Sequence, residues 1–177
     1  MKSFFRCVRR LIVVFAGIGL VNVLGGCVST HFIILPDAPG GDTEAFAYSI
    51  SDDGHAVVGE SRTEASARAQ HGEGVRWSKT RKSALRPGGS ASWDVETLGF
   101  LPGPDKYSPA FGVSEDGQIV VGVGHQDIGL ANDSAYEWRY STGLLALGRL
   151  SGDTFSVANA VSGSGWVAVG SSAPAFS

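Results

Sequence analysis

Apolar and polar positions alternate in blocks along this chain, and the same block occurs three times. The segments AYSISDDGHAVVGES, AFGVSEDGQIVVGVG and ANAVSGSGWVAVGSS occupy residues 47–61, 110–124 and 158–172. In each segment a β-branched residue precedes a polar stretch that contains Gly, and an apolar run with a second Gly follows. Because the segments align without a gap, we interpret them as copies of one structural unit.

The polar stretch in each block predicts a tight hairpin turn. The central pairs are Asp53-Gly54, Asp116-Gly117 and Ser164-Gly165. Glycine adopts the positive φ that such a turn needs without steric cost, and the Ser two residues before each pair can bond the turn amides. We therefore predict three β-hairpins with their turns at these pairs.

The apolar run after each turn predicts a strand. The runs at 56–58, 119–121 and 167–169 contain no polar residue, which indicates burial on both faces. The Gly after each run is expected to end the strand, at a bulge or at a close approach of another backbone. These residues are Gly59, Gly122 and Gly170.

The residues between the blocks predict two further strands per unit. GVRW and SAYEW each end in a Trp, and Trp77 and Trp138 recur at one repeat position, which favours a packing role. ETLGFLPG at 96–103 matches LALGRLSG at 145–152, and IILPDAPG at 33–40 is a weaker version. The longer first unit has polar excess segments, 62–73 and 79–93, which are expected to be loops.

Together these elements predict an all-β fold of tandem four-stranded β-meander repeats, propeller-like and incomplete or open. Within the repeat domain 32–177 the units cover about 32–94, 95–143 and 144–177. Propellers have about 4–8 blades, and the third unit stops before its Trp. The strand at 166–170 is therefore expected to form an open, apolar sheet edge through which copies of the chain could associate.

The motif order resembles the HAF-type extracellular repeat family of bacteria. The resemblance is carried by L-G-x-L-x-G elements, by S-x-A-x-x-[IV]-S-x-D-G-x-x-V-V-G blocks and by A-[FY]-x-W, and it covers about 32–177. SAYEW matches the last element well, whereas GVRW keeps only its Trp. The resemblance implies a secreted or surface β-repeat protein with no common catalytic activity, so it assigns no catalytic residue.

The first 27 residues have the pattern of a bacterial export signal. Residues 1–10 are basic and 11–24 are apolar apart from one Asn, a run too short for a hydrocarbon core of about 30 Å. LGGC, which ends at Cys27, resembles the lipobox of bacterial lipoproteins and implies that Cys27 is acylated. Residues 1–26 are then the signal peptide and 27–31 a lipidated linker. The alternatives are a plain signal peptide with an accidental Cys and an uncleaved anchor helix.

If Cys27 is acylated, the protein is exported and anchored in the cell envelope through its acyl chains. Val28 stands where an Asp often retains such proteins at the inner membrane, so the resemblance favours the outer membrane.

The charge distribution argues against nucleic acid as a partner. The first 26 residues carry four of the 14 Lys and Arg residues and none of the 17 acids, so the rest of the chain is clearly acidic. One basic stretch, from Arg76 to Arg86, is the exception. We interpret it as a solvated hairpin loop rather than a polyanion site.

Motifs that would indicate chemistry are weak. The four His residues have no metal-ligand spacing, so we predict no metal, no cofactor and no catalytic residue. Trp166 follows the third turn, where the other copies have His55 and Gln118, and it is the candidate ligand contact.

We expect a non-catalytic structural or binding module whose partner is an envelope protein or a glycan. One alternative is a propeller-type enzyme acting on polysaccharides. Another is a fragment of a longer repeat protein without a function of its own.

The lipidation hypothesis predicts the effect of removing one thiol. In a Gram-negative host, Cys27→Ser should abolish incorporation of labelled palmitate and membrane association, because no acyl chain can then be attached. Cys7→Ser, inside the signal segment, should change neither. Unaltered labelling of Cys27→Ser would contradict the hypothesis.

Overall fold

The computed structural model describes residues 33–39, 41–63, 72–80, 92–103, 106–125 and 133–174. The predicted signal peptide, linker and Cys27 lie outside the described residues. All of the strands belong to the unit Leu35–Ser177.

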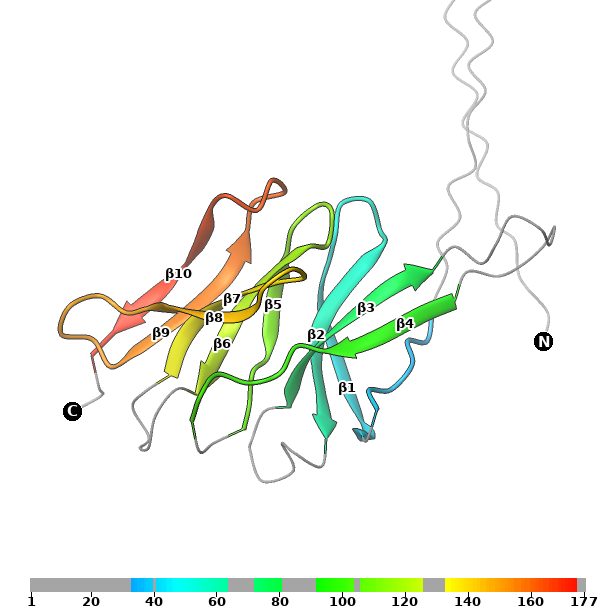
Figure 1. Cartoon of the computed structure of the whole chain (residues 1–177), viewed down its shortest axis with the longest axis horizontal. Helices are drawn as coiled ribbons and strands as arrows, with labels where there is room; N and C mark the ends of the chain where they lie inside the picture. Colours follow the sequence, from blue (N-terminus) through cyan, green and yellow to red (C-terminus); the bar gives the residue numbers. More distant parts are fainter. Residues whose placement is uncertain are drawn as a thin grey trace, which may run out of the picture. The chain divides into compact units, whose positions relative to one another are not determined.

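The described residues form ten strands in three antiparallel sheets, with no helix. The first sheet has the order β1 (Gly41–Ile50), β2 (Ala56–Thr63), β3 (Glu73–Thr80) and β4 (Ser92–Thr97). The second has the order β5 (Ala110–Val113), β6 (Ile119–His125), β7 (Asp133–Arg139) and β8 (Gly143–Gly148). The third pairs β9 (Phe155–Val161) with β10 (Ala168–Ala173). The prediction of open, tandem β-meander repeats is confirmed, and no closed ring occurs among the described strands (Figure 1).

Two expectations about the limits of the strands are wrong. The predicted loops 62–73 and 79–93 contain strand residues, because β2 reaches Thr63, β3 extends from Glu73 to Thr80, and β4 begins at Ser92. Their central residues lie outside the described ranges. The sheets also divide later than the sequence units, since β4 pairs with β3 and β8 with β7. The repeated segments 96–103 and 145–152 therefore each contain the last residues of one sheet and the connection to the next sheet.

Gly59, Gly122 and Gly170 lie inside β2, β6 and β10 and do not end these strands, contrary to the prediction. The expected close approach is present, because a Cβ added at Gly122 would lie 2.1 Å from the Pro109 carbonyl oxygen. A β-bulge at Phe111 in the neighbouring strand brings that backbone close. The other two copies repeat the arrangement, with Gly59 opposite a bulge at Tyr48 and Gly170 opposite a bulge at Asn159.

The largest core cluster joins the first two sheets. Its buried members are Ala56, Val58, Leu98, Leu101, Ala110, Val113, Val120, Tyr136 and Trp138. A second cluster covers the other face of the first sheet, where Leu35 and Ala38 pack with Val57, Val75 and Trp77. Both repeated Trp residues are thus buried, as predicted from their recurrence.

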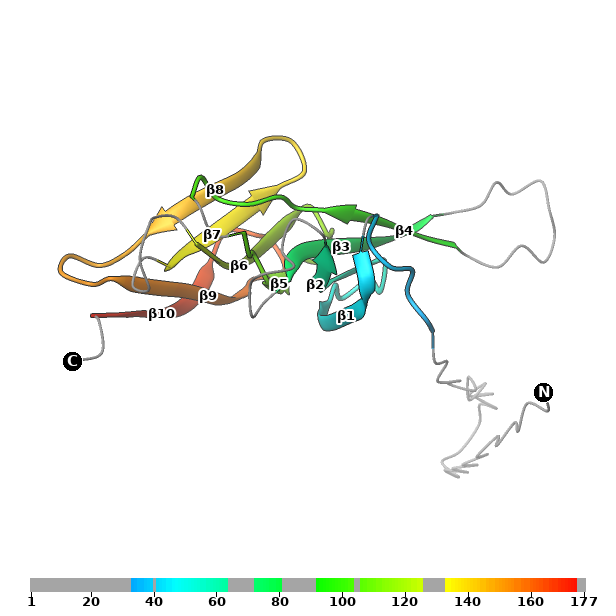
Figure 2. The ribbon, with the colours of Figure 1, turned by 90° about the horizontal axis from the view of Figure 1, so that it is seen from below.

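The third sheet has a much smaller core. Val121, Ala135 and Ala158 form its buried contact with the second sheet. The run 167–169, predicted to be buried on both faces, is exposed, with 58% of Val167 and 57% of Val169 accessible. In the first two sheets this run belongs to an inner strand, whereas β10 is an edge strand with β9 on one side and no described strand on the other (Figures 1 and 2).

The close backbone approach at the bulge predicts that adding one methyl group at Gly122 destabilises the protein more than adding one at Gly124. Gly122→Ala should lower the free energy of unfolding by about 1–3 kcal/mol or more, because the new Cβ meets a backbone carbonyl that cannot move independently. Gly124→Ala, on the same strand, is the control. Its Cβ would meet the flexible Leu101 side chain at 3.3 Å, so its loss should be clearly smaller. Equal losses in urea unfolding would show that the bulge contact is not the cause.

Candidate functional site

The first two hairpin turns contain the same pattern of hydrogen bonds. In the first, the Ser51 hydroxyl donates to Asp53 Oδ1 (2.6 Å) and accepts from the Ala56 amide (2.9 Å), while the His55 amide donates to the same Asp53 oxygen (2.8 Å). The second turn repeats these bonds with Ser114 and Asp116, at 2.7, 3.0 and 3.0 Å. Gly54, Gly117 and Gly165 have φ of 68°, 69° and 76°, so the turns lie where the repeat alignment predicts them.

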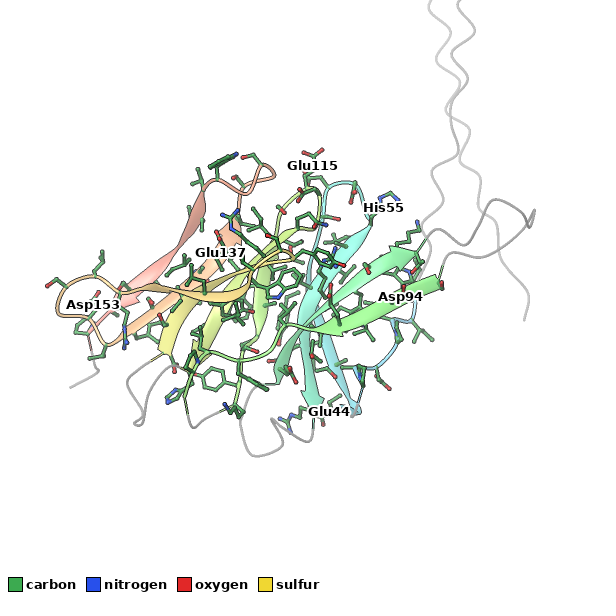
Figure 3. The ribbon with its side chains drawn as sticks, in the orientation of Figure 1. Glu44, His55, Asp94, Glu115, Glu137 and Asp153 are labelled. Carbon is green, nitrogen blue, oxygen red and sulfur yellow. The ribbon has the colours of Figure 1, made fainter. Side chains whose placement is uncertain are left out.

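The third turn has a weaker version of this network. Ser164 replaces the Asp, and its hydroxyl lies 3.3 Å from that of Ser162. The Ser hydroxyl and then the backbone amide lower the pKa of Asp53 and of Asp116 below the ordinary Asp value. The carboxylates of Asp53 and Asp116 therefore accept hydrogen bonds from their own turns. Figure 3 shows His55 and Glu115 at the turn ends of the first two hairpins.

Buried serines link each sheet to the next. The Ser108 hydroxyl donates to the Gly99 carbonyl (2.6 Å) and accepts from the Gly74 amide (3.0 Å), so it joins the start of the second sheet to the first. Ser156 makes the same pair of bonds, to Gly148 (2.6 Å) and from Ala135 (2.8 Å). The S-x-A part of the repeat motif is thus a joint between sheets.

Arg76 strengthens the first of these joints. Its Nε donates to the Gly117 carbonyl at 2.7 Å, and its Nη1 donates to Glu96 Oε1. The guanidinium also lies over the rings of Trp138 and Tyr140, at 5.8 and 5.7 Å. The interpretation of the basic stretch as a solvated loop is therefore wrong for Arg76, which is buried. Arg81, Lys82 and Arg86 lie outside the described residues.

Large apolar side chains are exposed on and beside the third sheet. We use the term third-sheet surface for Leu150, Trp166, Val167 and Val169, which are 71%, 87%, 58% and 57% accessible. Trp166 is thus exposed, as expected of a ligand contact. No described contact tests its predicted role.

Aromatic side chains of β1 and β5 form a second group at the surface, which the sequence analysis did not predict. Phe46 and Tyr48 stack with ring centroids 6.5 Å apart, and Tyr48 meets Phe111 at 5.7 Å across β1 and β5. Tyr48 donates to Glu60 Oε1 at 2.7 Å, and desolvation followed by this bond raises the pKa of Tyr48 to about 12. Because Tyr48 and Phe111 are the bulge residues of their copies, aligning the repeats at this position would have indicated the group.

One polar pair lies inside the second sheet. His125 Nδ1 lies 2.8 Å from Asp133 Oδ1, and the His125 ring packs beside Tyr107. The described residues contain no group of three or more His, Cys, Asp or Glu side chains that could hold a metal ion.

Comparison with known proteins gives no match to a family model, a curated protein or a solved structure. Within the described part of the chain, no helix is long and apolar enough to cross a membrane.

The Arg76 contacts predict a strong effect of neutralising one cation. Arg76→Met should lower the free energy of unfolding by about 1.5–3 kcal/mol, the usual contribution of a buried hydrogen bond from a charged group. Arg139→Met is the matched control, because its ion pair with Glu137 is exposed on the Arg side and such pairs contribute about 0–1 kcal/mol. Similar losses for both variants in urea unfolding would contradict the role of Arg76.

The turn carboxylates predict acid sensitivity. The folded-state pKa of Asp116 is lowered, so its stabilisation is present above the unfolded value of about 4 and is lost as the pH falls through the folded value. Asp116→Asn should therefore reduce the fall in melting temperature below about pH 4. Ser164→Asp should rebuild the network in the third turn, raise the melting temperature near neutral pH and steepen the fall in acid. Parallel melting curves for all three proteins would contradict this.

Proposed function

We propose that this protein is a non-catalytic β-repeat module, anchored by lipid in the cell envelope, whose third sheet binds a protein partner. The carrying observation is the third-sheet surface, where four large apolar side chains are more than half exposed. Val169 lies on β10, Trp166 and Val167 lie in the turn before it, and Leu150 lies in the segment before β9. Large exposed apolar side chains around one sheet are typical of interaction surfaces. The lipobox resemblance at Cys27 and the resemblance to extracellular repeats support the envelope location.

The polar residues of the repeat support a structural role for the first two sheets. Asp53 and Asp116 hold turns, Ser108 and Ser156 join sheets, and Arg76 bridges the first two sheets. We propose that the first two sheets are a scaffold that supports the third sheet, to which the partner binds.

Glycan binding is a second candidate function. The stacked, half-exposed rings of Phe46 and Tyr48 support it, since aromatic faces pack well against apolar faces of ligands. Retardation in gels that contain envelope polysaccharide, removed by Phe46→Ala, would favour this candidate over protein binding.

Photo-crosslinking in living cells tests the protein-binding proposal. A photoreactive phenylalanine analogue at Trp166 or at Val169 should give a discrete protein adduct, because both side chains lie at the proposed interface. The same analogue at Leu145 on β8, which is 65% accessible, is the control and should give none. Identical adducts from all three positions, or none from Trp166 and Val169, would overturn the proposal.

A further inference from the structure

Among the described strands, the third sheet has two members, whereas each of the other two sheets has four. The strands equivalent to β10 are β2 and β6, and each is hydrogen-bonded on both sides. β2 lies between β1 and β3, and β6 lies between β5 and β7. β10 pairs with β9 alone among the described strands. Its other edge therefore presents the backbone groups that β2 and β6 use to bind a third strand.

The repeat shows which side chains belong beside this edge. In the joint between the first two sheets, Leu98 and Leu101 are 5% and 2% accessible, in one cluster with Tyr136 and Trp138 of β7. Their counterparts in the next unit, Leu147 and Leu150, are 47% and 71% accessible. The two joints differ in that β7 provides Tyr136 and Trp138 to cover Leu98 and Leu101, whereas no described strand covers Leu147 and Leu150.

A glycine of β10 occupies the repeat position over which an aromatic ring lies in the second sheet. In the second sheet the Tyr136 ring lies across Gly122, and its hydroxyl donates to the Ser108 and Pro109 carbonyls at 2.9 and 3.2 Å. Gly170 is the counterpart of Gly122. The atoms nearest to a Cβ added there are backbone atoms of β9, with no ring among them.

We propose that β10 accepts a β-strand from a partner that carries the aromatic-x-Trp pattern of β7. The strand pairs antiparallel to β10, as β7 pairs with β6. Its aromatic residue lies across Gly170 and its Trp covers Leu147 and Leu150. Strand addition to an open edge combines main-chain hydrogen bonds with side-chain pockets, which supply affinity and specificity respectively.

The side chains of β10 argue against a second copy of this chain as the occupant. Paired β10 strands of two copies would present Gly170, Ser171 and Ser172 to each other. These small residues cannot fill the volume that Tyr136 and Trp138 occupy in the first joint. A strand with two large aromatic side chains fits the surface better.

Peptide titration tests this inference, which rests on the proposed binding role of the third sheet. The probe is the dye-labelled segment 133–148, which contains β7 and β8, added to the full chain in detergent and followed by fluorescence anisotropy. We expect saturable binding that weakens about tenfold or more when Tyr136 and Trp138 of the peptide are both Ser. Hydrogen exchange should show new protection of the amides of β10.

Variants of the protein give a matched control for the peptide. Leu150→Asp should weaken binding about tenfold, because it places a charge under the incoming Trp. Ile50→Asp, at a similarly exposed apolar position on β1, should leave the affinity unchanged. Neither variant alters a buried residue, so both should fold.

Several outcomes would overturn the inference. They are absence of saturable binding, equal affinity for the Ser peptide, protection confined to other strands, and a dimer of the free chain in which β10 is already protected. Peptide binding without a crosslinked adduct in cells would contradict the proposed function alone. An adduct without peptide binding would contradict the strand-acceptor role alone.

Discussion

Each four-stranded sheet of this protein is apolar on both faces, so each face needs a neighbour to exclude water. Full burial of one large apolar side chain contributes about 1.5–3 kcal/mol to the free energy of unfolding. A sheet with an uncovered face lacks this contribution for each apolar side chain on that face. In the first sheet Trp77 faces Ala38 on one side, and Val58 faces the second sheet on the other. The third sheet meets this requirement on one face only, at Val121 and Ala158. Its exposed apolar residues follow directly from this difference.

The contacts between sheets depend on small residues and on backbone groups as much as on apolar side chains. Gly122 lets a bulged backbone approach, and the ring of Tyr136 then crosses it to reach two carbonyls. Ser108 connects three segments through one buried hydroxyl. A buried hydroxyl or carbonyl without a partner is costly, so these bonds fix how adjacent sheets meet.

The sequence was informative where one residue type has one local role. Asp116-Gly117 predicts its turn because the required φ and hydrogen bonds are local, and the recurrence of Trp138 indicates packing. Reasoning from local composition was wrong for Arg76, since its partners Gly117 and Trp138 belong to the next sheet. It was also wrong for the run 167–169, whose burial depends on neighbouring strands. The Phe46–Tyr48 stack was missed because alternation along a strand does not reveal a bulge.

A sheet of this protein is thus stable only where both of its faces are covered. Native-state hydrogen exchange of individual backbone amides tests this claim most directly. We expect the amides of β6 and β7 to exchange only through global unfolding, whereas those of β10 exchange much faster through local opening. Equal protection of β6 and β10 in the monomeric chain would show that burial of both faces does not determine the stability of a sheet.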